Sequence, residues 1–305
     1  MIARVAVDAA YGRIRGRVRR TPVMEFSTPE GAPITLKLEL FQHSGSFKVR
    51  GGFNSVLAQG VPEAGLIAAS GGNHGAAVAY IARELGVRAE IHVPTTAAPV
   101  KIGRIRALGA DVRVAGALYA DAQAACDERI VESGALAIHP FDAPLTVAGQ
   151  GTLGIEIEQQ LEAVDTVVVA TGGGGLAGGI AAALPHVRLV CVEPAQSCCL
   201  HAALAAGEPV PVEIDSIAAD SLGARQIGAV PWSVLETRAE SVLVSDEAII
   251  AARQSLWDEA QLVAEMGGAT AYAALHSGAW RPQHDERVVV VVCGANTDPA
   301  DLVTG

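Results

Sequence analysis

The sequence predicts an α/β protein with mainly parallel sheets flanked by helices. Short apolar segments rich in β-branched residues alternate with helical segments, and this order favours parallel strands joined by right-handed crossovers. Glycine-rich turns follow two of these segments, at residues 71–75 and 172–175. Hydrophobic residues make up 50% of the chain, as buried strands and the helices covering them require.

Composition limits the possible partners. The net charge of −11 argues against nucleic acid. No apolar run reaches the roughly 18 residues of a membrane span, so we expect no membrane partner, and the N-terminus lacks the features of a signal peptide. The five cysteines are scattered without a CxxC pair. This pattern is typical of reduced thiols and predicts a cytoplasmic protein.

The first half of the chain predicts short βα units. Strands are expected, from their apolar or alternating patterns, at residues 35–40, 65–70, 89–93, 111–114 and 135–138. Helices are expected after the turn at Lys48 and at residues 76–85, 99–108 and 118–132. In the first strand, Lys37 and Glu39 share a face with Thr35 by alternation. We interpret residues 65–142 as a small inserted domain, and residues 1–64 and 143–305 as a larger one.

The second half continues this alternation. Strands are expected at residues 166–170, 189–192, 242–244 and 287–292, and helices from 143 to about 161 and at 177–184. The run 287–292 is almost continuously β-branched, which predicts a central buried strand. Residues 209–220, which contain proline and aspartate, are expected to form a loop. A long helix capped by Asp246 is expected to run towards Glu265.

The four glycines between the strand 166–170 and its helix predict an anion site. They are Gly172, Gly173, Gly174 and Gly175, followed by Leu176. Unpaired amides and the helix dipole attract a phosphate at such a position. A tight structural turn is the alternative, although one glycine would suffice for it. The spacing fits neither the dinucleotide nor the P-loop pattern.

The turn after residues 65–70 has the same strand–loop–helix context and predicts a second anion site. It consists of Ser70, Gly71, Gly72, Asn73, His74 and Gly75. Asn73 can both donate and accept hydrogen bonds. His74 is a possible base, although most histidines at a helix start are structural. Two anion sites indicate a phosphate cofactor together with a small carboxylate substrate.

The chain has only three lysines for covalent chemistry, namely Lys37, Lys48 and Lys101. Lys101 lies in a basic helical stretch and is expected on a solvated face. Lys48 follows a tight turn and precedes two glycines, which permit close backbone approach. Taken alone, this segment favours an ordinary lysine at the start of a helix, and only the rest of the chain can favour a catalytic one.

Several motifs in order resemble one family, the fold-type II enzymes that use pyridoxal 5′-phosphate (PLP). The resemblance is to the serine/threonine dehydratase (threonine ammonia-lyase) and serine racemase branch, and implies a tryptophan synthase β-like fold with two domains. The segments that carry it are residues 19–22, 44–51, 70–75, 139–142, 148–152, 172–175, 192–194, 244–247 and 293–296. One such motif would be weak evidence, whereas the ordered set is highly specific.

The resemblance implies a role for each matched residue. Lys48 is implied to be the Schiff-base lysine, nucleophile and later base. Phe47 would pack against the cofactor ring, Asn73 would bond to its phenolic oxygen, and the run from Gly172 to Leu176 would hold the phosphate. Residues Ser70, Gly71, Gly72, Asn73 and His74 would grip the substrate carboxylate.

Cys293 lies where the family has Ser or Cys facing the pyridine nitrogen. A neutral thiol is a weak hydrogen-bonding group, so the cofactor would be a weaker electron sink. A buried apolar cysteine is the alternative interpretation. No separate regulatory domain is expected after this residue.

Gly71 stands where racemases of the family have a serine that acts as a second acid/base. Elimination is therefore expected: a dehydratase (ammonia-lyase) that converts L-threonine or L-serine to a 2-oxo acid and ammonia. The alternatives are a β-replacement enzyme of the cysteine synthase type, a serine racemase, and a non-catalytic ligand-binding protein. The resemblance also implies a homodimer.

The sequence shows no complete set of metal ligands. Glu193 matches one ligand of the family's cation site, but Cys199 stands where a carboxylate would continue it. Neighbouring Cys198 and Cys199 lack further His or Cys ligands at usable spacing for zinc. Glu193 is therefore only a weak candidate ligand.

Overall fold

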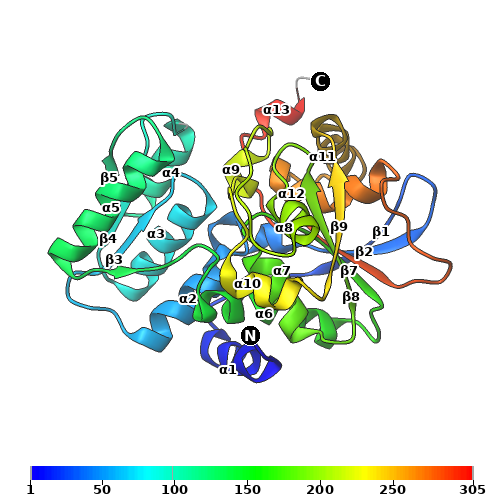
Figure 1. Ribbon diagram of the computed structural model, residues 1–305, viewed down its shortest axis with the longest axis horizontal. Helices are drawn as coiled ribbons and strands as arrows, with labels where there is room; N and C mark the ends of the chain where they lie inside the picture. Colours follow the sequence, from blue (N-terminus) through cyan, green and yellow to red (C-terminus); the bar gives the residue numbers. More distant parts are fainter. Residues whose placement is uncertain (1, 98, 304–305) are drawn as a thin grey trace.

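Two sheets organise the molecule. The structure is a computed structural model that describes residues 2–97 and 99–303. Figure 1 shows the four-stranded sheet at the left and the six-stranded sheet at the right, with helices between and around them. Helices and strands alternate along most of the chain, so the predicted α/β class is confirmed.

The larger sheet has the strand order β1-β2-β10-β7-β8-β9. Its strands are β1 (Val23–Ser27), β2 (Pro33–Lys37), β7 (Thr166–Ala170), β8 (Arg188–Pro194), β9 (Ala239–Val244) and β10 (Val288–Val291). β1 and β2 are antiparallel, and all other neighbours are parallel. All four valines of β10 are buried between β2 and β7, which confirms the predicted central strand.

The smaller sheet is wholly parallel and has the order β5-β4-β3-β6. Its strands are β3 (Leu66–Ala69), β4 (Ala89–Val93), β5 (Asp111–Val114) and β6 (Leu136–Ala137). The helices of this segment are α3 (Asn73–Leu85), α4 (Pro99–Ala107) and α5 (Tyr119–Ser133). All of these elements lie within about two residues of their predicted positions, except that α3 begins three residues earlier.

The remaining helices accompany the larger sheet. They are α1 (Arg4–Ile14), α2 (Lys48–Gln59), α6 (Pro144–Gln160), α7 (Gly175–Ala183), α8 (Cys199–Ala206), α9 (Ala219–Leu222), α10 (Ala229–Leu235), α11 (Asp246–Ala260), α12 (Met266–His276) and α13 (Ala300–Val303). Two short 3-10 helices, η1 (Glu39–Phe41) and η2 (His43–Gly45), precede α2. α6 and α7 pack with their backbones in close approach, because a Cβ added to Gly151 would lie 2.5 Å from the carbonyl oxygen of Gly179.

The structure corrects the predicted start of the larger sheet. β1 precedes the strand that was expected to be first, and β2 already ends at Lys37. Glu39 lies in η1, so strand alternation does not set its orientation. Both side chains are fully buried, because each pairs with an opposite charge. The expected loop 209–220 also ends in a short helix, α9, which begins at Ala219.

The long helix predicted from Asp246 is present, but it ends before Glu265 and its cap is a different residue. α11 ends at Ala260, after which Gln261 adopts a left-handed conformation with φ of 55°, and α12 begins only after Glu265. The N-cap of α11 is Ser245, whose side chain accepts a hydrogen bond from the backbone of Ala248. Ser245 takes the cap because its backbone is extended while Asp246 is already helical.

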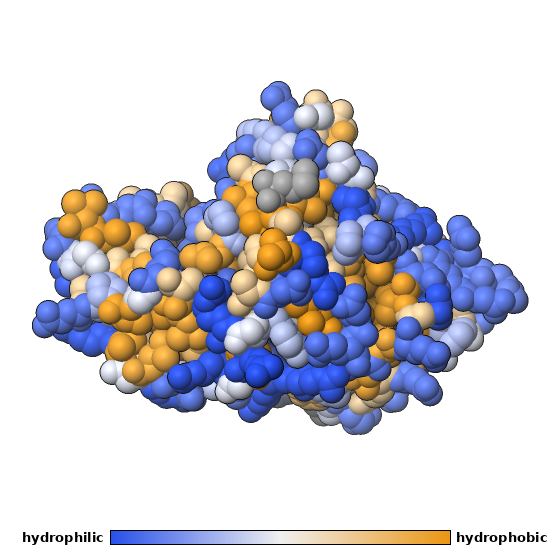
Figure 2. Space-filling model, turned by 90° about the horizontal axis from the view of Figure 1, so that it is seen from below, coloured by the Kyte–Doolittle hydropathy of each residue, from blue (hydrophilic) through white to orange (hydrophobic). Residues whose placement is uncertain are grey.

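Two main hydrophobic clusters follow the two sheets. In the part of the chain that the structure describes, no helix is long and apolar enough to cross a membrane. Figure 2 shows hydrophilic and hydrophobic residues mixed on the lower face, with a hydrophobic area at the left. Several exposed large hydrophobic side chains do come from the segment of the smaller sheet, among them Val100, Val114, Leu118, Tyr119 and Val131.

Candidate active site

Lys48 is the first residue of α2, and the turn before it is joined to the end of the central strand. The backbone N–H of Phe47 donates to the carbonyl of Cys293 at 3.3 Å. Ser46 forms an isolated antiparallel bridge with Gly294. Residues 246 and 248 positions apart in the sequence are thereby held side by side.

The Lys48 amine is held by one hydrogen bond and lies beside an aromatic ring. Its Nζ donates to the carbonyl of Pro140 at 2.9 Å and lies 5.1 Å from the centroid of the Phe47 ring. Burial lowers the pKa of the amine to about 8, against the opposing Coulombic effects of Cys293 and Glu265. About one tenth of the amine is therefore neutral at pH 7, far more than for an ordinary lysine, and the neutral form is the nucleophile.

Asn73 is held between two other buried side chains. It is the first residue of α3, and its Nδ2 donates to Oε1 of Glu265 at 2.6 Å. Its Oδ1 accepts from Nδ2 of Asn296. Glu265 precedes α12 and Asn296 follows β10. The predicted cofactor partner therefore sits where three elements meet.

His74 is not placed to act as a base. Its Nε2 is bonded to the carbonyl of Ile138 at 2.7 Å, and burial together with the charge of Lys48 lowers its pKa to about 3. It stays neutral at physiological pH and fastens α3 to the segment after β6. Ser70, by contrast, is partly exposed, and its Oγ accepts from the N–H of Gly72 at 3.2 Å.

The glycine run between β7 and α7 forms a tight cradle. Gly174 has a φ of 84°, which a residue with a Cβ rarely adopts. A Cβ on Gly173 would lie 2.4 Å from the ring of Phe141, and one on Gly175 would lie 3.0 Å from the same residue. Phe141 directly follows Pro140, whose carbonyl holds Lys48. The glycine run and the lysine thus share one neighbouring segment.

The donors of this cradle fit a phosphate. Within the described ranges, the backbone N–H groups of Gly172, Gly173 and Gly174 donate to no protein group, and they lie at the N-terminus of α7. Unpaired N–H groups and the positive end of a helix dipole are the usual anion-binding elements. Together with a lysine of low pKa, these donors fit an aldehyde-bearing phosphate cofactor such as PLP.

Cys293 lies two residues after β10 and is buried. Its Sγ donates to the carbonyl of Gly267 at 3.5 Å. Burial, reinforced by the charge of Glu265, raises the pKa of the thiol. The thiol is therefore neutral, and it cannot act as the anionic partner that would keep a ring nitrogen protonated.

Glu193 is bonded within the protein. Its two carboxylate oxygens accept from the backbone N–H groups of Leu200 and His201, both at 2.8 Å. Burial raises its pKa to about 7, against the effect of those two donors. Cys199 donates to the carbonyl of Gly172 at 3.3 Å. Among residues 2–97 and 99–303, no cluster of three or more His, Cys, Asp or Glu side chains could hold a metal.

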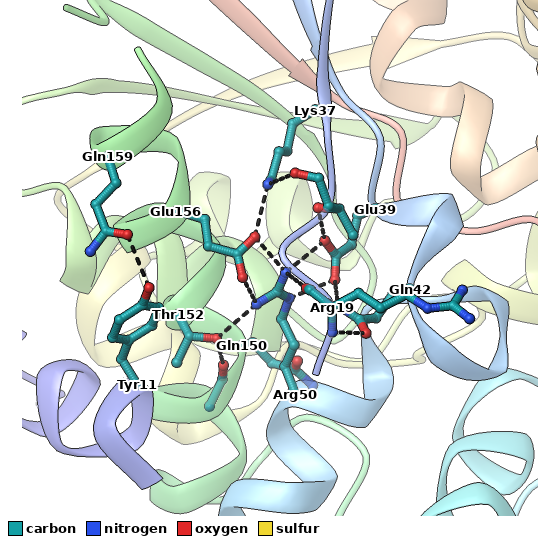
Figure 3. Close-up of polar contacts among 12 residues, drawn as sticks. Tyr11, Arg19, Lys37, Glu39, Gln42, Arg50, Gln150, Thr152, Glu156 and Gln159 are labelled. Atoms are coloured by element: carbon teal, nitrogen blue, oxygen red, sulfur yellow. Dashed lines mark hydrogen bonds and ion pairs between the residues drawn. The ribbon is translucent and has the colours of Figure 1, made fainter. Parts of the chain in front are cut away.

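A buried ion network lies beneath the start of α2 (Figure 3). Arg50 donates to both carboxylates, Glu39 at 2.5 and 2.9 Å and Glu156 at 2.8 and 2.9 Å. Lys37 donates to Glu156 at 2.8 Å. Burial alone would raise the pKa of Glu156, but the two cations lower it. The network fixes the helix that begins with Lys48.

Two predictions about lysines therefore change. Lys37 and Glu39 pair with groups on α2 and α6, which strand periodicity could not indicate. Lys101 does not lie on a free solvated face, because it forms an ion pair with Asp220 of α9. The contacts of Glu265 and Asn296 with Asn73 were also missed, although Asn296 lies in a segment that resembles one of the family's motifs.

Comparisons with known proteins agree with this geometry. A sequence profile described as "Pyridoxal-phosphate dependent enzyme" matches residues 14–294. The L-threonine ammonia-lyase of Geobacter sulfurreducens is 38% identical over 286 residues, which cover 90% of this chain and 71% of that protein. The phenylserine dehydratase of Ralstonia pickettii is 36% identical over 308 residues, 97% of this chain and 93% of that protein. A solved structure of maize serine racemase superimposes with a TM-score of 0.92 at 30% identity, covering 99% of this chain and 96% of that one.

Proposed function

Because the chain belongs to the pyridoxal-phosphate dependent enzyme family, we propose that it is an ammonia-lyase (dehydratase) of small β-hydroxy amino acids. L-Threonine and L-serine are the proposed substrates, each converted to a 2-oxo acid and ammonia. The observation that carries the proposal is the Lys48 amine, whose pKa is lowered to about 8 close to Asn73, Cys293 and the glycine cradle.

The proposed cofactor contacts come from five places in the chain. They are Lys48 for the covalent bond, Phe47 beside the ring, Asn73 for the phenolic oxygen, Gly172, Gly173, Gly174, Gly175 and Leu176 for the phosphate, and Cys293 near the ring nitrogen. When bound, PLP supplies an electron-withdrawing ring that stabilises negative charge at Cα of the attached amino acid.

Lys48 would move the protons. Once displaced by the substrate amine, its neutral Nζ can take the proton from Cα and return one to the leaving β-hydroxyl. Gly71 has no side chain with which to protonate the opposite face, which favours elimination over racemisation. The neutral thiol of Cys293 favours the same outcome, because it provides no charge to prolong the life of a carbanion.

The loop from Ser70 to His74 would bind the substrate carboxylate. The N-terminus of α3 begins at Asn73, and backbone N–H groups there suit an anion. The imidazole of His74 is already bonded to Ile138. We therefore assign to His74 a contribution through its backbone, and to Ser70 one through its hydroxyl.

Three further assignments belong to the same proposal. We divide the chain into a small domain, residues 65–142, and a large domain, residues 1–64 and 143–305; the two separate sheets support this division. The five free cysteines support a cytoplasmic location. A homodimer is carried over from the family resemblance, and light scattering on the purified protein tests it.

A substrate panel tests the function. The PLP-loaded protein is assayed for 2-oxo acid release from L-threonine, L-serine and phenylserine, with D-serine formation and sulfide-dependent cysteine synthesis measured in parallel. Release of 2-oxo acid is expected and should fall by at least about 10²–10⁴-fold in Lys48→Ala, because the covalent step is lost as well. Undiminished activity in that variant contradicts the assignment of Lys48, and racemisation or cysteine synthesis without 2-oxo acid would replace the proposed reaction.

A further inference from the structure

Three polar side chains from distant segments meet beside the candidate cofactor site. Asn73, Glu265 and Asn296 are each only 5–6% exposed. Asn73 Nδ2 donates to Glu265 Oε1 at 2.6 Å, and Asn73 Oδ1 accepts from Asn296 Nδ2. Buried polar groups are costly unless paired, so this chain of bonds fixes all three side chains.

The chemistry of the three groups determines how the Asn73 amide points. Oε1 of Glu265 accepts from the Asn73 amide, so the edge facing Glu265 is the NH2 group. Burial raises the pKa of Glu265, and this bond from Asn73 opposes that rise by favouring the carboxylate. The edge facing Asn296 must then be the oxygen, and Asn296 must present its own NH2 group. An amide can be rotated by 180° without a change of shape, and an ionised Glu265, which has no proton to donate, fixes which edge faces it.

Glu265 is itself rigidly placed. Its backbone N–H donates to the carbonyl of Gly294 at 3.0 Å. Its carboxylate packs against the same residue, because a Cβ on Gly294 would lie 2.0 Å from Oε1. The side chain therefore has little room to take another rotamer, and its oxygen stays where Asn73 needs an acceptor.

One hydrogen of the Asn73 amide remains available. The NH2 group has two hydrogens, and Glu265 takes one; no other group in the described ranges accepts from Nδ2. We propose that Glu265 and Asn296 are positioning residues that hold Asn73 with this second hydrogen directed to the bound cofactor. The inference rests on the proposed function, because it takes PLP as the ligand.

The test measures the cofactor's spectrum and affinity in addition to turnover. For wild type, Asn73→Ala, Glu265→Ala, Glu265→Gln and Asn296→Ala, the absorbance of bound PLP is titrated against pH, and apo-protein is titrated with PLP. Loss of one bond to the cofactor should raise Kd by roughly 10- to 100-fold. Glu265→Ala and Asn296→Ala should shift the spectral titration in the same direction as Asn73→Ala.

Double variants make the test specific. If Glu265 acts through Asn73, then Asn73→Ala combined with Glu265→Ala should shift the spectrum no further than Asn73→Ala alone. Glu265→Gln keeps a carbonyl acceptor and should restore most of the wild-type spectrum. Additive shifts, or a wild-type spectrum in Glu265→Ala, would overturn the inference.

A matched control separates positioning from general stability. Asn54 is a buried asparagine of α2 that donates to the carbonyl of Leu145 at 2.6 Å. Asn54→Ala should lower Tm without moving the spectral titration. Should the wild-type protein bind PLP and show the non-additive cycle but release no 2-oxo acid, the proposed function fails while the positioning role stands.

Discussion

Among the single residues, Lys48 is the one whose reactivity depends most on its surroundings. Burial lowers its pKa to about 8, while Cys293 and Glu265 act in the opposite direction. An ordinary lysine has a pKa of about 10.4 and would be almost fully protonated at neutral pH. The protein therefore makes this amine reactive by desolvation.

The first prediction concerns the pH dependence of cofactor uptake. Only the neutral amine attacks an aldehyde, so the rate at which apo-protein takes up PLP should rise with pH and level off above about 8. Stopped-flow absorbance measures this rate, with free Nα-acetyl-lysine as the control, whose rate should still rise at pH 10. A protein rate that climbs in parallel with the free lysine contradicts the lowered pKa.

The second prediction concerns the buried ion network. Arg50→Met would leave Glu39 without a cationic partner and Glu156 with Lys37 alone. An uncompensated buried charge typically lowers the free energy of unfolding by about 3–5 kcal/mol. Urea titration should therefore show a clearly lower midpoint for this variant. Arg287→Met, at an exposed pair with Asp165, is the control and should change the midpoint far less. Equal effects of the two variants would show that the buried network contributes no more to the free energy of unfolding than an exposed ion pair does.

Some single residues could be predicted from the sequence, and others could not. The two glycine turns were predictable from local motifs, whereas the role of Lys48 followed only from the ordered set of motifs along the chain. The partners of Lys37 and Lys101 were not, because Glu156 lies 119 positions after Lys37 and Asp220 lies 119 positions after Lys101. Charge alone places both lysines in water. Only the fold shows which carboxylates meet them.

At the scale of elements, the short strands with clear apolar boundaries were predicted most closely, although β1 was missed. Thr166–Ala170, Ala89–Val93 and Asp111–Val114 have the predicted bounds, because their apolar runs are short and bounded. α12 was missed, since it begins Met266-Gly267-Gly268 and glycine has low helix propensity. Its formation depends on tertiary packing, as a Cβ on Gly268 would lie 2.2 Å from the carbonyl of Gly294.

The third prediction concerns the packing of α6 on α7. Gly151→Ala would place a methyl group 2.5 Å from the carbonyl of Gly179 and force the helices apart. Overpacking of this kind typically costs about 1–3 kcal/mol. Gly12 of α1 is the matched helical control, because nothing lies within 4 Å of its added Cβ; Gly12→Ala should stabilise by about 0.5–1 kcal/mol. Thermal melts of both variants measure the difference, and similar shifts would contradict close helix contact.

At the scale of the whole molecule, two parts are built on separate sheets (Figure 1), and the candidate site takes Asn73 from the smaller part and Glu265 from the larger. Lys101 of α4 pairs with Asp220 of α9. Beside this pair, a Cβ on Gly72 would lie 3.1 Å from the carbonyl of Asp220. The ion pair thus joins α4 of the smaller part to α9 of the larger part, next to the loop proposed to bind the substrate carboxylate.

The last prediction is that this ion pair holds the two parts closed over the substrate. Lys101→Met should raise KM by roughly twofold to fivefold, since a partly exposed pair contributes up to about 1 kcal/mol, with Tm nearly unchanged. The double variant Lys101→Asp/Asp220→Lys re-forms the pair with its charges exchanged and should restore KM. If KM depended on some other contact of either residue, the double variant would not restore it. Arg113→Met, at an exposed pair within the smaller part, is the control and should leave KM unchanged. An unaltered KM in Lys101→Met, measured at low ionic strength where the pair is strongest, would show that closure depends on apolar and backbone contacts instead.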